Sequence, residues 1–294
     1  MVPPALEHVL PPSWKAQVLN WLQEDTPSFD WGGYIVGDVP REAYLFGKGK
    51  TPAVLAGVPF FDEVFKYLDC RVEWHMKEGE TFQPVKHVAT VRGPARKLLL
   101  GERVALNLLA RCSGIATKSR HFKDIADENG FKGVIAGTRK TTPGFRLVEK
   151  YGMLVGGIDG HRTDLSSMVM LKDNHIWSSG SITKAIEQTR SVSGFSLLID
   201  VEVRSESEAD EAIAAGADVV MLDNIEGRVL LDLAQRLKER WGAKRKFLLE
   251  TSGGIEEGNL RSRAVNPIDI LSTSAVHQSV QHIDFSLKIQ KPKP

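Results

Sequence analysis

The sequence predicts an α/β protein in which a small α+β domain precedes a (β/α) barrel domain. After about residue 130, short apolar runs alternate with amphipathic helical segments, a pattern typical of parallel strands covered by helices on both faces. Before that point, strand-like runs surround a helical segment instead. The length of 294 residues also fits two unequal domains. We expect a first domain over residues 1–115, a barrel over 116–289 and a polar tail over 290–294 that can pack back on the first domain.

The first domain begins with an expected helix over residues 13–25, with Ser13 as its N-cap. Strand-like alternation then covers residues 42–56, 70–75 and 85–92. The segment "VPFFDEVFKYL" between these runs is helical in pattern. A long helical region follows over 93–130, and we expect Gly114 to break or kink it, because glycine is a poor helix former.

The barrel elements follow in a regular order. Its expected strands are "GVIAG", "MLVGG", "SMVMLK", "LLIDVEV", "DVVMLD", "FLLETSGG" and "IDILST". Helical segments such as "SITKAIEQTRSV", "SESEADEAIAAG" and "GRVLLDLAQRLKERW" lie between them. This alternation predicts parallel strands whose carboxyl ends meet at one mouth.

Composition excludes several classes of function. With 42% hydrophobic and 26% charged residues, the chain is typical of a globular protein. Its 38 Lys+Arg and 37 Asp+Glu leave a net charge of +1, so no overall field recruits nucleic acid or an anionic membrane. Any anion site must therefore be local.

The cellular setting is predicted from cysteine usage and from the first residues. Cys70 and Cys112 are too few for a disulfide framework and have no metal-binding spacing. The opening "MVPPALEHVLPP" has no apolar core of a signal peptide, and no apolar stretch approaches about 20 residues. We expect a cytosolic protein, with the nucleus as the alternative location.

Charged and small residues follow nearly every expected barrel strand. Lys172, Glu202, Asp223 and Ser252 are separated by 30, 21 and 29 residues, close to one strand-helix unit each. Because the chemistry of such barrels lies at the carboxyl ends of the strands, we expect one mouth to hold them all. The full set of strand-end candidates is Thr138, Arg139, Lys140, His161, Arg162, Lys172, Glu202, Asp223, Ser252, Gly253 and Gly254.

The cations of this set outnumber its acids. Glu202 and Asp223 cannot neutralise the four cations together, so an anionic ligand is favoured over internal ion pairs alone. Arginine suits carboxylates and lysine suits phosphate, which indicates a ligand set with both groups. The four cations are Arg139, Lys140, Arg162 and Lys172.

Two further features complete the expected mouth. The Ser252-Gly253-Gly254 turn offers backbone N–H groups to a phosphate, with a short helix expected near Glu256. Glu202 and Asp223 can hold a largely hydrated Mg²⁺ or ribose hydroxyls. Asp200 points the same way as Glu202 and is either a helper or an inert filler of the barrel.

Five segments together resemble the quinolinate phosphoribosyltransferase family, in particular its eukaryotic, fungal-like members. They are "GTRKTTPGFRLVEKYGMLVGG", "HRTDLSSMVMLKDNHI", "DVEV", "GADVVMLDN" and "SGGI", and the similarity runs from about residue 5 to 289. The resemblance implies an N-terminal α/β sandwich, an open TIM-like barrel, and dimers whose partner completes each active site. It also implies formation of nicotinate mononucleotide, CO₂ and pyrophosphate from quinolinate and 5-phosphoribosyl 1-pyrophosphate (PRPP), with Mg²⁺ and no organic cofactor, in NAD biosynthesis.

The resemblance also assigns site residues. Arg103 would come from the other subunit, Glu202 and Asp223 would hold Mg²⁺ through water, and Lys140 and Lys172 would join these two acids as the catalytic set. The quinolinate contacts would be Arg103, Thr138, Arg139, His161, Arg162 and Lys172. The PRPP contacts would be Lys140, Lys172, Glu202, Asp223, Ser252, Gly253, Gly254 and Ser274.

The sequence departs from the family pattern at three positions, and other functions stay open. Leu198 occupies a position where lysine is usual, Asp200 replaces a common glutamate, and Ser274 replaces a glycine. The alternatives are a nicotinate phosphoribosyltransferase without decarboxylation, a Schiff-base aldolase using Lys172, and a non-catalytic phosphate-ligand protein. Assembly of dimers into hexamers is also left open, and no nucleic acid or membrane partner is expected.

Overall fold

The computed structural model describes residues 6–49 and 51–291, which form two compact units. The first unit takes the described residues up to Arg120, Thr142–Gly157 and those from Ser279 on. The second takes His121–Thr141 and Ile158–Gln278. The units are therefore interleaved along the sequence. Among the described residues, no helix is both long and apolar enough to cross a membrane.

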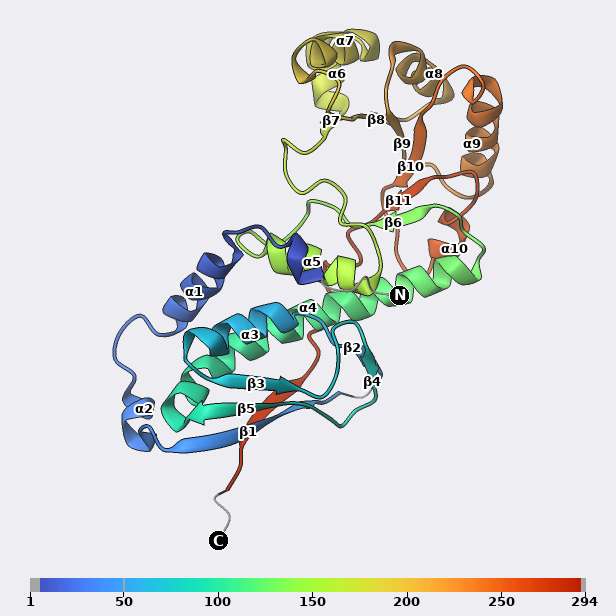
Figure 1. Cartoon of the computed structure of the whole chain (residues 1–294). Coiled ribbons are helices and arrows are strands. Elements are labelled where there is room, and N and C mark those ends of the chain that lie inside the picture. Colours follow the sequence, from blue (N-terminus) through green and yellow to red (C-terminus); the bar gives the residue numbers. More distant parts are fainter. Residues whose placement is uncertain (1–5, 50, 292–294) are drawn as a thin grey trace. The chain divides into compact units, whose positions relative to one another are not determined.

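The first unit is built on a four-stranded antiparallel sheet with the strand order β12-β1-β5-β3 (Figure 1). Its last strand in sequence, β12, pairs with β1 at the edge of the sheet. A separate two-stranded pair joins β2 to β4. The strands are β1 (Pro40–Gly47), β2 (Ala53–Val54), β3 (Arg71–Trp74), β4 (Thr81–Phe82), β5 (Lys86–Pro94) and β12 (Phe285–Ile289).

Helices of the first unit pack on this sheet around an apolar core. Leu45 of β1, Phe61 of α3 and Leu108 of α4 are all within this core and are almost fully buried. Trp14 and Trp21 pack against it through Phe60 and Phe145, with ring centroids 5.8 and 5.1 Å apart. The helices are η1 (Leu6–Val9), α1 (Trp14–Asp25), α2 (Trp31–Val36), α3 (Val58–Tyr67), α4 (Ala95–Glu128) and α5 (Arg146–Gly156).

Two expectations about this region are wrong. Gly114 does not interrupt α4, which runs continuously over Ala95–Glu128. A Cβ at Gly114 would lie 2.3 Å from the backbone oxygen of Gln281, so the glycine permits close approach of the returning chain. The segment "MLVGG" is the end of α5 rather than a strand, because its apolar residues continue the buried stripe of that helix.

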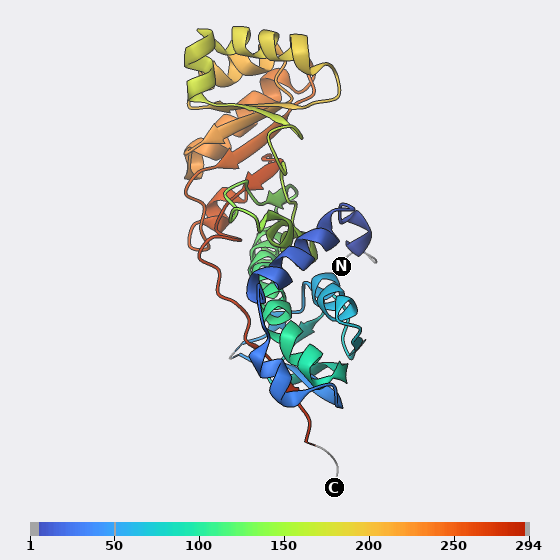
Figure 2. The same cartoon turned by 90° about the vertical axis from the view of Figure 1, so that its left-hand side faces the viewer.

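The second unit is an open, all-parallel sheet of six strands in the order β6-β11-β10-β9-β8-β7. This order confirms the open barrel-like class. Helices α7, α8 and α9 lie along one side of the sheet, with α7 packed on β7 and α8 on both β8 and β9 (Figures 1 and 2). Its strands are β6 (Val134–Ala136), β7 (Val169–Leu171), β8 (Ile199–Val203), β9 (Val219–Asp223), β10 (Leu248–Ser252) and β11 (Ile270–Ser272).

Local sequence explains the helices of this unit. Ser181 and Ser205 cap α7 and α8, because their side chains accept the backbone N–H of Lys184 and Glu208. Helix α9 buries one leucine-rich stripe and exposes its charged face. The helices are α6 (Asp173–Ser179), α7 (Ile182–Ser193), α8 (Glu206–Ala215), α9 (Gly227–Trp241) and α10 (Leu260–Arg263).

The raised pKa of Glu78 in the first unit can be tested by measuring the free energy of unfolding at two pH values. Its carboxylate accepts the backbone N–H of Gly57 at 2.6 Å, and burial raises its pKa from 4.5 to about 8. A raised folded-state pKa means that the wild-type free energy of unfolding falls as pH rises from 4.5 through about 8. Glu78→Gln keeps the acceptor and removes the charge. It should therefore raise the free energy of unfolding by on the order of 3 kcal/mol near pH 9 and by little below about pH 5.

Urea unfolding at the two pH values measures this difference. The exposed Glu239, changed to glutamine, serves as the control and should show no pH-dependent gain. An equal effect of Glu78→Gln at both pH values would contradict the raised pKa.

Candidate active site

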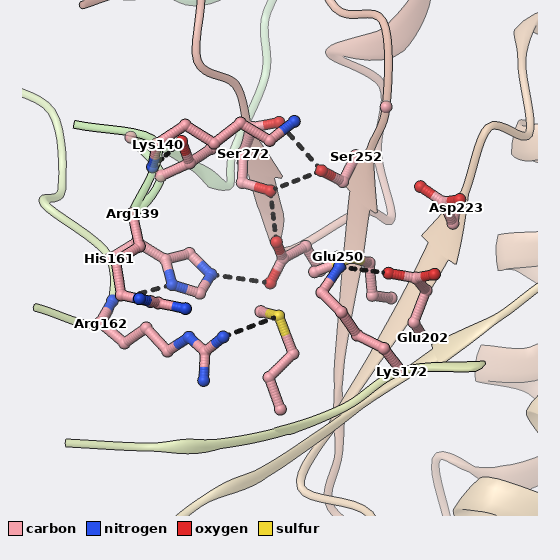
Figure 3. Close-up of a pocket in the computed structure, with 15 residues that line it drawn as sticks. Arg139, Lys140, His161, Arg162, Lys172, Glu202, Asp223, Glu250, Ser252 and Ser272 are labelled. Atoms are coloured by element: carbon pink, nitrogen blue, oxygen red, sulfur yellow. Dashed lines mark hydrogen bonds and ion pairs between the residues drawn. The ribbon is translucent and has the colours of Figure 1, made fainter. Parts of the chain in front are cut away.

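One pocket opens at the carboxyl ends of the six parallel strands and encloses about 300 Å³ (Figure 3). Every strand of the sheet contributes side chains at or just after its end, as expected for a barrel mouth. The lining residues are Gly137, Thr138, Arg139, Lys140, His161, Arg162, Met170, Lys172, Glu202, Met221, Asp223, Glu250, Ser252, Gly253 and Ser272.

The pocket brings together most of the residues expected at the mouth. Ten of the thirteen candidate site residues line it. Gly254 and Ser274 lie close in sequence to lining residues but do not line the pocket themselves. Arg103 lies on α4 in the first unit, exposed, and is not part of this lining.

The loop after β6 carries Thr138, Arg139 and Lys140. The Thr138 hydroxyl accepts the backbone N–H of Lys140 at 3.2 Å. His277, which is 1% exposed, holds the loop from the other side, with Nε2 3.2 Å from the backbone oxygen of Lys140. Among the described residues, neither Arg139 nor Lys140 forms an ion pair with a carboxylate. Both positive charges remain available to a ligand.

Lys172 follows β7 and lies against the acids of the neighbouring strands. Its Nζ is 2.6 Å from Glu202 Oε2, so one internal ion pair is formed. Burial, followed by the charge of Glu202, raises the pKa of Asp223, and Lys172 and Arg204 oppose this rise. The two carboxylates thus repel each other in a partly desolvated place.

A cation would relieve this repulsion. Mg²⁺ prefers oxygen ligands and keeps several waters, so the pair Glu202 and Asp223 fits a hydrated Mg²⁺. These side chains come from adjacent strands β8 and β9, which fixes their spacing.

The Ser252-Gly253-Gly254 turn follows β10. Gly253 and Gly254 have φ of +87° and +59°, a left-handed conformation that glycine adopts without strain. A Cβ on Gly253 would lie 2.3 Å from Asn224 Oδ1, so a larger residue there would have to displace the Asn224 side chain. The prediction of a helix near Glu256 is wrong. The Glu256 N–H donates to Asn259 Oδ1 in a turn, and the four-residue helix α10 begins only at Leu260. The backbone turn remains as an anion cradle without a helix dipole.

Two buried acids that the charge count from sequence did not include lie at the pocket: Glu250 lines it, and Asp200 lies close to Glu250 without lining it. Glu250 and Asp200 are both 0% exposed. Glu250 accepts a hydrogen bond from Ser272 and lies 3.2 Å from His161 Nε2 (Figure 3). Burial, with the neighbouring Glu250, raises the pKa of Asp200 well above its usual value. Glu250 thus adds a third acid to Glu202 and Asp223 in the pocket lining, so the excess of cations is smaller than the sequence indicated. The cations without a carboxylate partner among the described residues are Arg139 and Lys140.

Arg162 is held between the loop and the floor. Burial lowers its pKa first, then the charge of Arg139, whereas Asp200 and Glu250 act in the opposite direction. Its Nη1 donates to the backbone oxygen of Met168 at 3.3 Å. The nearby positive charges of Arg139 and Arg162 indicate a place for a shared anion.

Sequence reasoning missed Glu250, Ser272 and His277. A glutamate inside the apolar strand "FLLETSGG" was a usable signal, because Glu250 and Ser252 are two apart and lie on the same face. No comparable sequence signal marked His277, because its contact with the loop after β6 depends on the path of the chain after β11. Fold and pocket together define an open (β/α) barrel protein with a charged pocket at the carboxyl ends of its strands.

Comparison with known proteins identifies the family. Residues 115–288 match the family described as quinolinate phosphoribosyl transferase, C-terminal domain, and residues 30–113 match the N-terminal domain of the same family. The chain belongs to the quinolinate phosphoribosyltransferase family.

Relatives extend over almost the whole chain. The nicotinate-nucleotide pyrophosphorylase (carboxylating) of Rattus norvegicus is 48% identical over 290 residues, covering 98% of this chain and 95% of that protein. The protein of the same name from Homo sapiens is 47% identical over 282 residues, covering 96% and 93%. The solved nicotinate-nucleotide pyrophosphorylase from Francisella tularensis is 30% identical with a TM-score of 0.85, covering 96% of this chain and 98% of that one.

Proposed function

We propose that the protein transfers the phosphoribosyl group of PRPP to quinolinate with loss of CO₂, giving nicotinate mononucleotide and pyrophosphate. The observation that carries this proposal is one mouth in which arginines suited to carboxylates lie beside a glycine turn suited to phosphate. Family membership and the names of the relatives support the same reaction.

Quinolinate would occupy the arginine side of the pocket. Arg139 and Arg162 offer forked donors for its two carboxylates, and Thr138 and Lys172 line the same space. His161 is assigned to this subsite by the family resemblance. Three guanidinium groups, counting Arg103 of a partner subunit, exceed what the single carboxylate of nicotinate needs.

PRPP would occupy the opposite side of the pocket. Its 5′-phosphate would lie on the Ser252-Gly253-Gly254 turn, and its pyrophosphate near Lys140. Glu202 and Asp223 would hold the ribose hydroxyls and a hydrated Mg²⁺, which when bound stabilises the negative charge of pyrophosphate. Ser274, two residues past β11, would donate its hydroxyl to the phosphate.

The chemistry depends on orientation and electrostatics rather than on proton transfer. The pyridine nitrogen attacks C1 of the ribose as the bond to pyrophosphate breaks, so positive charge develops on the sugar. The carboxylates of Glu202 and Asp223 favour this charge, and Lys140 and Lys172 favour the departing anion. The quaternised ring then loses its 2-carboxylate as CO₂. The electron pair of the broken bond stays on C2, where the adjacent positive nitrogen stabilises it, and a proton from solvent binds to C2 to complete the product.

Release of ¹⁴CO₂ from carboxyl-labelled quinolinate tests the proposal. We expect release that requires both PRPP and Mg²⁺, with nicotinate inactive as an acceptor. Formation of nicotinate mononucleotide from nicotinate without CO₂ release would favour the non-decarboxylating transferase instead. The human nicotinic acid phosphoribosyltransferase shares the fold, with a TM-score of 0.57 at 17% identity. Activity with neither acceptor would reject both transferases.

A homodimer with shared active sites would explain why Arg103 lies outside the pocket lining. If the partner supplies Arg103, then mixing inactive Arg103→Ala and Lys172→Ala proteins should restore about one quarter of wild-type activity, because half of the exchanged dimers are mixed and one of their two sites is intact.

Subunit exchange is verified separately with two affinity tags. Each variant alone should stay inactive at every concentration. Demonstrated exchange without recovery would contradict shared sites.

A further inference from the structure

A continuous chain of hydrogen bonds, buried at its centre, crosses the floor of the pocket from β10 and β11 to the loop after residue 160. Ser252 Oγ lies 3.1 Å from Ser272 Oγ, Ser272 Oγ donates to Glu250 Oε1, and Glu250 Oε2 lies 3.2 Å from His161 Nε2 (Figure 3). Glu250 is the centre of this chain and is 0% exposed. A buried carboxylate needs donors on both oxygens, and these contacts supply them.

The position of the proton on the His161 ring follows from the hydrogen bond at Nδ1. The backbone N–H of Arg162 donates to His161 Nδ1 at 2.8 Å, so Nδ1 must be an acceptor and carries no proton. The single proton of the neutral imidazole is then on Nε2, where it donates to Glu250. Both ring nitrogens are engaged within the protein, and the ring has no N–H left to offer a carboxylate ligand.

The same reasoning decides against a metal ion at this place. His161, Asp200 and Glu250 have ligand-type atoms within 4.8 Å of one another. A metal on Nε2 of a neutral imidazole would require the proton on Nδ1, where it would face the donating Arg162 N–H. The arrangement therefore fits a hydrogen-bonded histidine and not a ligated one.

The backbone at His161 shows why it must be held. His161 has φ of +56°, a left-handed conformation that is uncommon for residues other than glycine. Its N–H donates to Asp159 Oδ1 at 2.5 Å, which fixes the turn from one side, and Glu250 fixes the ring from the other. Arg162 is the next residue, and its N–H is bound to that ring. The direction of the Arg162 side chain therefore depends on the position of the imidazole.

We infer that Glu250 is a positioning residue: it holds His161 as the Nε2–H tautomer, and His161 in turn sets the backbone that aims Arg162 at a carboxylate ligand. This inference rests on the proposed use of quinolinate for its kinetic consequence, but the tautomer itself does not. His161 then serves the carboxylate subsite through Arg162 rather than through its own N–H.

Steady-state kinetics of three variants measures the consequence. Glu250→Ala should raise the KM for quinolinate by at least about tenfold while the KM for PRPP stays within about twofold. Glu250→Gln retains an oxygen acceptor for Nε2–H, so its quinolinate KM should stay within about threefold of wild type. Glu257→Gln is the matched control, because Glu257 pairs with His121 at 2.9 Å on the exposed surface, and it should leave both KM values unchanged.

¹⁵N NMR of histidine-labelled wild-type protein without ligand supplies the readout that needs no activity. The His161 signals, assigned by their loss in His161→Gln, should show a protonated Nε2 and a bare Nδ1. An imidazolium or an Nδ1–H tautomer would overturn the inference, whether or not Glu250→Ala folds and whether or not quinolinate is the substrate. Equal increases of both KM values in Glu250→Ala, or no recovery in Glu250→Gln, would also overturn it. Wild-type protein that does not use quinolinate would reject the proposed function and leave the tautomer result to decide the role of Glu250.

Discussion

Lys172→Ala is expected to lower kcat/KM by at least about a thousandfold, or about 4 kcal/mol of transition-state stabilisation. Lys172 is the cation closest to the acid pair, with its Nζ 2.6 Å from Glu202 Oε2. Its charge also opposes the rise in the pKa of Asp223. Without it, two mutually repelling carboxylates would face the pyrophosphate, so the variant loses an attraction and gains a repulsion.

Quinolinate-dependent CO₂ release under saturating PRPP measures this loss, and circular dichroism verifies the fold. Lys123→Ala is the control, since Lys123 pairs with Asp127 at 2.6 Å on the exposed face of α4 and should keep full activity. Near-normal turnover of a folded Lys172→Ala protein would remove this residue from the proposed catalytic set. The same protein also tests the Schiff-base alternative: borohydride trapping of wild type, but not of Lys172→Ala, would favour an aldolase.

Arg139→Ala should reduce kcat/KM for quinolinate by about a thousandfold, mainly because a bidentate, charge-assisted contact is lost. Arg139 lines the pocket and forms no ion pair with a carboxylate among the described residues, so its removal leaves no internal acid unpaired. The loss should therefore appear in ligand binding and turnover, with little change in stability. Arg139→Lys should recover only part of the activity, because an ammonium group cannot form the two parallel hydrogen bonds.

Isothermal titration with quinolinate separates binding from chemistry. Arg228→Ala provides the control, because the Arg228 side chain is 91% exposed on α9. Wild-type affinity in Arg139→Ala would contradict the carboxylate role. Complete recovery in Arg139→Lys would mean that charge alone, and not the fork of arginine, is what the ligand needs.

The strand-end residues could be predicted from sequence because the positions of the strand ends agree with the spacing of one strand-helix unit. Parallel strands bring their carboxyl ends to one edge, and one strand-helix unit separates Lys172, Glu202 and Asp223. The pocket contains all three. The same logic located Arg139, which follows β6, and Ser252, which is the last residue of β10.

The features that could not be predicted from sequence depend on contacts between distant segments. "MLVGG" is apolar enough for a buried strand, and only its packing within α5 decides that it is helical. Gly114 looks like a helix breaker until the return of Gln281 explains the missing side chain. Ser274 lies two residues after the end of β11 and is not among the residues that line the pocket.

The pairing of β12 with β1 determines when the first unit can be complete during synthesis. Its sheet needs Phe285–Ile289, which are synthesised only after the whole second unit, and α5 comes from between the two segments of that unit. Until then the edge of β1 has unpaired backbone groups that invite pairing with another chain. A nascent chain shorter than about 285 residues would thus be exposed to aggregation. Fragments that contain β1 but lack β12 should benefit most from a chaperone that covers this edge.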